Sequence, residues 1–380
     1  MIMKKQLFIL AMGGVLLALS ACSNDETVAV NQGDEISFRP LVTGVTRSTA
    51  GPMTTWTTDD EFNVYANFYD ASVEDGYKDS KYFQANFKKQ NSGGFTSTQK
   101  YYWPVFNTGD KMTFTAIYGG TQKDGTPGKV EAFSPNSTAT NQMDLMVARK
   151  ELTAKESPVV LNFRHALSQV VVKVKNSDAN LDFDVKGVCI GYVNTTGEFN
   201  YDYNYTESSA DVGAVTTTQE TSENAAAGTL TPTNPQALVK RTNWNLTAMT
   251  GEAMAENYKY SQTWTTAQSI TSTISSATSL TSFVSWLLIP QTQNAATAYS
   301  ATTQGTANSN PTLNGSYIAL RLAIYNYNGS ARSNQLVEEQ WCYWPCDFTW
   351  NPGYVYTYTV DLAGGGYQPI NTTSASTTLE

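Results

Sequence analysis

The sequence predicts an all-β protein built from two tandem antiparallel β-sandwich domains. The first observation is that apolar residues alternate with polar ones in many short runs, bounded by Gly, Asn, Asp and Pro. The second is composition: charged residues make up only 15% of the 380 residues, and aromatic residues make up 12%. This mixture suits strands and turns, and no window shows sustained helical amphipathicity.

The N-terminal segment, residues 1–21, is typical of a bacterial export signal. Two lysines precede an apolar run from Leu7 to Leu19, which is too short to span a bilayer as a helix. The segment ends in Leu19-Ser20-Ala21-Cys22, which resembles the lipobox of bacterial lipoproteins. We therefore expect Cys22 to be lipidated and residues 22–33 to form an acidic, polar tether. The alternative is an ordinary signal peptide that happens to precede a cysteine.

Residues 34–157 are expected to form the N-terminal sandwich. Short apolar or alternating runs follow one another along this half, at residues 36–38, 62–68, 82–87, 111–118 and 145–148. Such runs are typical of half-buried antiparallel strands.

Residues 158–380 are expected to form the C-terminal sandwich, because Lys155-Glu156 and Pro158 precede a long strand-like run. The expected strands lie at residues 159–174, 190–193, 283–289, 317–325 and 354–362. Two tracts rich in Thr, Ser, Ala and Asn, residues 205–235 and 247–282, are expected as surface insertions or long hairpins.

The charge balance argues against several classes of function. The chain carries a formal charge of −9, and loss of the export signal would leave 22 basic and 33 acidic residues, or −11. Because phosphate neutralisation needs clustered Lys and Arg, nucleic acid is not an expected partner. The single histidine, His165, argues against most metal-hydrolase and Ser-His-Asp interpretations, so we expect no enzyme activity, metal or cofactor.

Two kinds of side chain could still carry redox or acid–base chemistry. His165 lies in an apolar run, where a buried structural histidine is favoured over a general base. Cys342 and Cys346 would lie ~13 Å apart on an extended strand, too far for a disulfide. A tight turn at Trp344-Pro345 could bring them together, so a disulfide between them stays open.

Two further groups could bind or cleave a carbohydrate. Trp341, Trp344 and Trp350 could form an exposed platform, although aromatic residues in a sandwich usually belong to the core. The adjacent carboxylates Asp59 and Asp60 would point to opposite faces of a strand, so they cannot act together as a glycosidase pair.

Several blocks of the sequence together resemble one family, the fimbrillin-like lipoproteins of Bacteroidetes, which are the subunits of type V pili. The most diagnostic block is Leu161 to Val170, which reads LNFRHALSQV. The other blocks are Thr46-Arg47 with Trp56, Asp60 and Phe62 to Tyr65, then Tyr102-Trp103-Pro104, Met112 to Tyr118, Asp144 to Ala148, Leu288 to Gln291, and Trp350 to Leu362 with Gly364-Gly365-Gly366.

The resemblance implies two transthyretin-like β-sandwich domains, transport to the outer membrane as a lipoprotein, and a place in a cell-surface fimbria. It further implies that a trypsin-like protease cuts after an early arginine and removes the first strand, whose place a strand of the neighbouring subunit then takes. In this sequence the first strand is expected at Glu35–Val42 and the cut after Arg47. The alternative is that Arg47 is an ordinary surface residue of an uncut anchor or tip subunit.

The expected function is therefore that of a structural or adhesive fimbrial subunit, with other subunits and the outer membrane as partners. Members of the family often continue past the glycine block with strands that serve as donors, whereas this sequence ends at Glu380 after a tail rich in Thr and Ser. Either the sequence is truncated or it lacks a donor strand, and in the second case a tip or accessory role is expected. The alternative function is a surface lipoprotein that does not polymerise and binds a glycan or a host protein.

Overall fold

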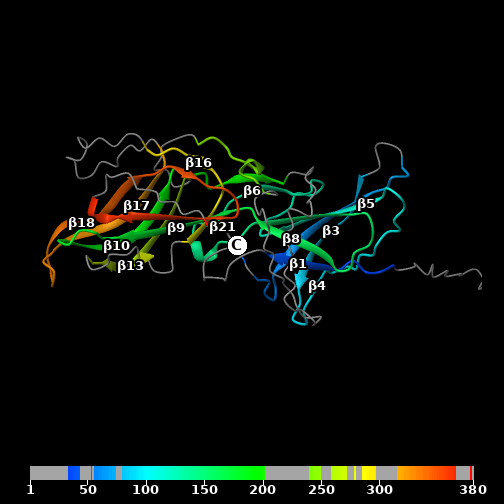
Figure 1. Ribbon diagram of the computed structural model, residues 1–380, viewed down its shortest axis with the longest axis horizontal. Coiled ribbons are helices and arrows are strands. Elements are labelled where there is room, and N and C mark those ends of the chain that lie inside the picture. Colours follow the sequence, from blue (N-terminus) through cyan, green and yellow to red (C-terminus); the bar gives the residue numbers. More distant parts are fainter. Residues whose placement is uncertain are drawn as a thin grey trace, which may run out of the picture. The chain divides into compact units, whose positions relative to one another are not determined.

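The computed structural model confirms the all-β fold class, because the regular secondary structure of the described chain is almost entirely strands (Figure 1). It describes residues 33–42, 53, 55–73, 79–201, 239–249, 258–271, 278–279, 285–296, 315–364 and 377–378. Helical structure in this part of the chain is confined to short 3-10 turns, among them Ala139–Asn141, Arg241–Asn243 and Leu362–Gly364.

The chain divides into two compact units, which are described separately. The smaller one contains residues 1–36 and 99–105. In its described part, the Ile36 amide donates to the Tyr101 carbonyl at 2.8 Å, and the Trp103 amide donates to the Asp34 carbonyl at 3.0 Å. This short antiparallel pairing is extended at its exposed side by an ion pair between Lys100 and Glu35, 2.7 Å apart.

The larger unit contains residues 37–98 and 106–380, and its first half forms a seven-stranded sheet in the order β1-β8-β7-β5-β2-β3-β4. β1 pairs with β8 in parallel, and every other neighbouring pair is antiparallel. The strands are β1 (Phe38–Val42), β2 (Glu61–Tyr69), β3 (Asp79–Lys89), β4 (Phe95–Thr96), β5 (Lys111–Tyr118), β7 (Met146–Leu152) and β8 (Val159–His165).

This sheet curls so that strands far apart in its order meet through their side chains. β1 is the first strand in the order and β3 is the sixth, yet the rings of Phe38 and Phe87 lie 4.7 Å apart. Phe62 of β2 and Phe114 of β5 point to the same aromatic interior and are at most 1% exposed. The period-two pattern in the sequence therefore corresponds to the inner face of a curled sheet.

The second half of the larger unit is a sandwich of two sheets. One has the order β13-β10-β17-β18, and the other has the order β14-β9-β20-β21 with β15 also paired to β9. The strands are β9 (Ser168–Lys175), β10 (Leu181–Gly191), β13 (Lys259–Ile270), β14 (Thr278–Ser279), β15 (Ser285–Leu288), β17 (Tyr317–Tyr327), β18 (Arg332–Pro345), β20 (Tyr354–Asp361) and β21 (Thr377–Thr378).

The core of this sandwich is filled by alternate residues of both sheets. Val170, Val172 and Val174 of β9 pack in one cluster with Phe183 and Val185 of β10. Each of these side chains is at most 2% exposed. Burying such apolar side chains stabilises the fold by about 1.5–3 kcal/mol each, which makes this cluster the main source of stability in this half.

A three-stranded sheet joins the two halves of the larger unit. β6 (Lys129–Phe133) comes from the first half, and it pairs with β11 (Gly197–Asn200), which pairs with β12 (Trp244–Asn245). A core cluster beneath it combines Ile117 and Val147 of the seven-stranded sheet with Phe199 and Trp244. A separate two-stranded sheet pairs β16 (Thr292–Gln293) with β19 (Phe348–Thr349).

The boundary between the expected sandwiches, near residue 157, precedes β8, which belongs to the seven-stranded sheet. Sheet membership changes between β8 and β9, at Ala166-Leu167, and both residues are fully buried. The run at 159–174 therefore forms two strands of different sheets, contrary to the expectation of a single strand. The division into two tandem transthyretin-like domains stays a prediction.

The structure describes part of one of the two polar tracts and none of the other. The tract at 205–235 lies outside the described residues. Part of the tract at 247–282 forms β13, a 12-residue strand at the edge of its sheet. The sequence leaves a surface insertion and a long hairpin open here, because both faces of this edge strand carry polar residues and lack the apolar alternation of a half-buried strand.

Candidate functional site

The structure confirms a strand near the N-terminus at the position where the sequence predicts the removable one. The expected strand at Glu35–Val42 is β1 over Phe38–Val42, and Glu35 makes an isolated bridge with Tyr102. β1 lies at one end of the order of the seven-stranded sheet, as Pro40 predicts, because a proline cannot donate a ladder hydrogen bond.

The backbone of β1 is held from one side within the described sheet. Its five residues pair in parallel register with β8, from Phe38 opposite Val159 to Val42 opposite Phe163. Just before β1, the Val159 amide donates to the Ser37 carbonyl at 2.8 Å, and the hydroxyls of Ser37 and Ser157 lie 3.2 Å apart.

The side chains of β1 are buried deeply for a strand at a sheet edge. Phe38, Leu41 and Val42 are 4%, 1% and 2% exposed. The Phe38 ring makes edge contacts with Phe87, Phe114 and Phe62, at centroid distances of 4.7, 5.2 and 6.2 Å. We call the space that β1 occupies, between β8 and these three rings, the β1 groove.

The energy of filling the β1 groove is large on the scale of protein stability. Burial of Phe38, Leu41 and Val42 contributes about 1.5–3 kcal/mol for each side chain. The sum is comparable to the whole free energy of unfolding of a typical domain, about 5–15 kcal/mol. An empty groove would therefore expose apolar surface and unpaired backbone groups of β8, which a new strand can cover.

The chain beyond the expected cut is anchored separately from β1. Arg47 lies outside the described residues, between β1 and Met53. The Met53 amide donates to the Asp144 carboxylate at 3.0 Å, and Trp56 packs against Phe163 and Phe95 with centroid distances of 5.2 and 5.3 Å. The sequence indicated Asp144 only as part of a strand motif, so its role as this anchor was missed.

His165 lies beside the same anchor. Its Nδ1 is 2.6 Å from the Asp144 carboxylate, and the two residues are each 4% exposed. This pair links the end of β8 to the carboxylate that holds Met53. The structure thus supports the interpretation of His165 as a buried structural residue.

The structure shows Cys342 and Cys346 as free thiols. Both lie on or directly after the extended strand β18, so the tight turn that a disulfide would need is not formed. Burial raises the pKa of Cys342 to about 11 and that of Cys346 to about 12. Cys189 is also buried, and Cys22 lies outside the described residues.

The three tryptophans considered as a carbohydrate platform are not exposed together. Trp344 and Trp350 are 2% and 0% exposed and belong to the sandwich core, whereas Trp341 is half-buried on the opposite face of β18. The core interpretation is therefore correct for two of the three.

Two other kinds of site were also considered. Among the described residues, no group of three or more His, Cys, Asp and Glu side chains is arranged to hold a metal ion. No helix in the described part of the chain is long and apolar enough to cross a membrane.

Several solved structures resemble this chain at low sequence identity. A candidate cell adhesion protein from Bacteroides ovatus is 13% identical with a TM-score of 0.43, over 92% of this chain and 98% of that one. A candidate cell adhesion protein from Parabacteroides distasonis is 8% identical with a TM-score of 0.42, over 90% and 92%. A fimbrial assembly protein from Parabacteroides distasonis is 9% identical with a TM-score of 0.34, over 87% and 94%.

The comparison with curated proteins gives no match. A family model described as fimbrillin-like matches residues 46–278, which is more than half of the sequence and includes most of the seven-stranded sheet. This chain belongs to the fimbrillin-like family.

Proposed function

We propose that this protein is a structural subunit of a cell-surface fimbria, and that the β1 groove is the site through which subunits join. The observation that carries the proposal is the contrast in β1 itself: its backbone is held by one neighbouring strand, β8, while its side chains fill the core of the sheet. A strand of this kind leaves a defined, apolar groove when it is removed. The most direct occupant of such a groove is a strand from another subunit.

The proposed trigger is a cut after Arg47. The chain on the C-terminal side of the cut stays attached through Met53 and Trp56, so the cut would separate β1 without loosening the rest of the sheet. A trypsin-like protease needs an accessible arginine, and the other arginine in this region, Arg39, lies within β1 and is half-buried.

The proposal gives the protein a structural role and no catalytic one. Membership of the fimbrillin-like family supports this, and so does the burial of the single histidine, His165, beside Asp144. The proposed partners are other fimbrial subunits.

The proposed route to the cell surface is as a lipoprotein anchored in the outer membrane through Cys22. The lipobox-like sequence before Cys22 and membership of the fimbrillin-like family support this route. The Cys22→Ser protein should be lost from the outer-membrane fraction while the parent remains in it. Equal amounts of the two proteins in that fraction would show that Cys22 is not the anchor.

Limited trypsin digestion followed by size-exclusion chromatography tests assembly. We expect the parent to lose its N-terminal segment after Arg47 and to form polymers, because the emptied β1 groove accepts a strand. Arg47→Ala should resist this cut and stay monomeric. Arg47→Lys is the matched control, because trypsin also cuts after lysine, and it should behave like the parent.

Polymers formed equally well by uncut Arg47→Ala would show that removal of β1 at this site does not control assembly. A cut parent that stays monomeric, with its groove still filled by β1, would contradict the proposed exchange.

A further inference from the structure

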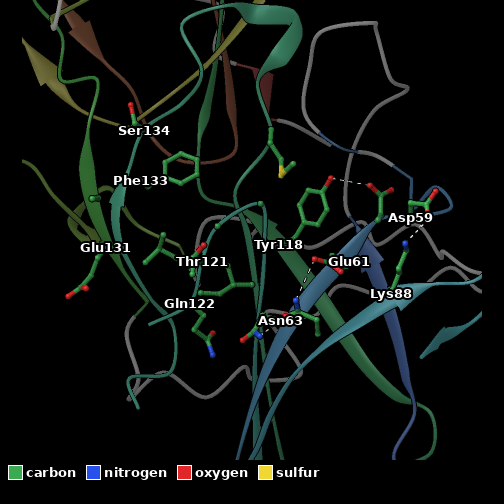
Figure 2. A pocket seen from close by; sticks show the side chains of 18 residues that line it. Asp59, Glu61, Asn63, Lys88, Tyr118, Thr121, Gln122, Glu131, Phe133 and Ser134 are labelled. Atoms are coloured by element: carbon green, nitrogen blue, oxygen red, sulfur yellow. Dashed lines mark hydrogen bonds and ion pairs between the residues drawn. The ribbon is translucent and has the colours of Figure 1, made fainter. Parts of the chain in front are cut away.

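A polar cleft of about 860 Å³ opens beside the seven-stranded sheet, away from the β1 groove. One wall is formed by the ends of β2, β3 and β5, and the other by β6 and Ser134 (Figure 2). The volume lies within the range of small-molecule sites, about 300–1,000 Å³. Such a space is large enough for a small ligand to contact both walls.

Four carboxylates line this cleft, those of Asp59, Asp60, Glu61 and Glu131, against a single lysine, Lys88, so the lining carries a net negative charge. Lys88 lies 2.7 Å from the carboxylate of Asp59, and Lys123 lies 2.7 Å from that of Glu131. Asp60 accepts hydrogen bonds from the amide and hydroxyl of Thr57, at 2.6 and 2.7 Å. In Figure 2 the Lys88 side chain points to Asp59, and Glu131 points away from the other labelled side chains. Two of the four carboxylates are held in ion pairs, so the cleft disfavours anions and attracts cations less than four free carboxylates would.

The neutral polar groups of the cleft are held in fixed positions. Asn63 and Asn86 face each other across β2 and β3, and the Asn63 amide donates to Asn86 Oδ1 at 2.7 Å. Asn63 in turn accepts from Gln84 at 3.2 Å, and Asn86 donates to Glu61 at 3.4 Å. These contacts orient a row of amide groups, and an amide both donates and accepts hydrogen bonds. Such groups suit the hydroxyls of a sugar, which also do both.

The opposite wall contributes apolar surface. Phe133 of β6 is half-buried, and Met143 is 56% exposed at the rim. A sugar ring presents C–H groups on one face and hydroxyls around its edge. Apolar surface facing a row of amides therefore matches the two chemistries of one saccharide.

The backbone of the cleft is held in an unusual conformation on both walls. Asp59 and Ala132, neither of which is a glycine, have φ angles of 78° and 50°. A residue other than glycine that is held at a positive φ angle costs on the order of 1–3 kcal/mol of stability, and such residues cluster at functional sites. Near Ala132 the pairing of β6 with β11 shifts register between Gly197 and Phe199, so the second wall bends at this point.

We propose that this cleft binds a neutral saccharide. The proposal depends on no step of strand exchange, because the cleft is complete in the uncut chain and none of its lining residues belongs to β1. The site would give a fimbrial subunit a glycan-binding surface. This surface remains available whether the β1 groove holds β1 or a strand of another subunit.

Saturation-transfer NMR with the uncut full chain tests the proposal. The probes are four neutral disaccharides (maltose, lactose, cellobiose and N,N′-diacetylchitobiose), with the anionic 3′-sialyllactose and a lysine-rich peptide as charged comparisons. We expect transfer to at least one neutral disaccharide. Asn86→Ala and Thr121→Val should each weaken its binding about tenfold or more, because each removes a hydroxyl-binding group from an exposed position. Gln335→Ala, an exposed amide on β18, is the matched control and should bind as the parent does.

Absence of transfer to all four neutral probes would overturn the proposal, as would equal binding by Asn86→Ala and Thr121→Val when thermal melts show that both are folded. Stronger binding of sialyllactose or of the peptide would show that the cleft selects charge instead. Because the protein stays uncut throughout, each of these results is independent of the outcome of the trypsin experiment.

Discussion

At the scale of single residues, Gly191 shows how an aromatic ring can require a glycine on the neighbouring strand. Gly191 of β10 pairs with Tyr317 of β17, and the Tyr317 ring lies directly over it. Tyr317 is 1% exposed, so the ring cannot swing out into solvent without losing its burial. A Cβ on Gly191 would collide with this ring.

Gly191→Ala should therefore lower the free energy of unfolding by about 1–3 kcal/mol, the usual cost of overpacking a core. Urea unfolding measures the change. In a Tyr317→Ala background the same substitution should cost much less, because the colliding ring is gone. An equal cost in both backgrounds would show that the ring is not the cause.

The buried cysteines give a second prediction at this scale. With pKa values of about 11 and about 12, Cys342 and Cys346 are almost entirely protonated at pH 8, and the protonated thiol is unreactive. In Cys22→Ser protein prepared without reductant, iodoacetamide at pH 8 should label neither until the chain is unfolded. After unfolding it should label both. A mass that shows Cys342 and Cys346 joined and unlabelled in unfolded protein would contradict the free-thiol state.

At the scale of elements, β1 differs from an ordinary edge strand because both of its faces are covered. Phe38 and Val42 lie on one face and Leu41 on the other, and all three are buried. An exchanged strand must therefore supply apolar side chains to both faces, and not only to alternate positions. This requirement restricts which strands can occupy the β1 groove.

Phe38→Ala should destabilise the uncut protein by about 3–5 kcal/mol, since the substitution leaves a cavity among Phe62, Phe87 and Phe114. Ser37→Ala, one residue earlier and outside the ring cluster, should change the free energy of unfolding by much less. Urea unfolding of the two variants makes the comparison. Equal stabilities would mean that β1 is not part of the core.

The same scale shows which elements the sequence could predict. Runs of strand-forming residues identified β2, β5, β17 and β20, although β5 and β17 are buried on both faces over part of their length. It did not separate β8 from β9, because the turn between them at Ala166-Leu167 is apolar and buried and carries no Gly, Pro or Asn. It also missed β13 and β18, whose edge positions are compatible with polar residues.

The sequence predicts β1 itself, but it predicts neither the rings that surround β1 nor the polar cleft. Pro40 and the apolar residues around it indicate an edge strand from local chemistry alone. The rings that receive Phe38 come from three other strands, and the polar cleft depends on the pairing of β6 with β11. Such contacts join residues far apart in the chain, and the period of a local pattern holds no information about them.

At the scale of the whole molecule, β6 and its partners join the two halves of the larger unit. Trp244 packs against Phe133 and Phe199 at centroid distances of 5.8 and 5.1 Å, and its indole N–H donates to the Ala166 carbonyl at 2.9 Å. These contacts connect β6, β11, β12 and the turn between β8 and β9. We infer that the two halves unfold together.

Scanning calorimetry should therefore show one cooperative transition for the parent. Trp244→Ala removes the shared ring at a cost of about 3–5 kcal/mol and should separate the unfolding into two transitions. Tyr82→Ala, an exposed aromatic residue on β3, should leave the single transition intact. Two transitions in the parent would contradict the coupling.

The parallel pairing of β1 with β8 also has a consequence for how the chain reaches its native state. The paired residues are about 120 positions apart, so β1 leaves the ribosome long before its only partner in the described sheet is present. When β8 arrives, the β1 groove of every folding copy is still unfilled, and each β1 must find it. Where many copies emerge close together, the β1 of one copy competes with that of its neighbour for the same vacancy. Folding at a high local concentration should therefore favour domain-swapped dimers of the uncut chain.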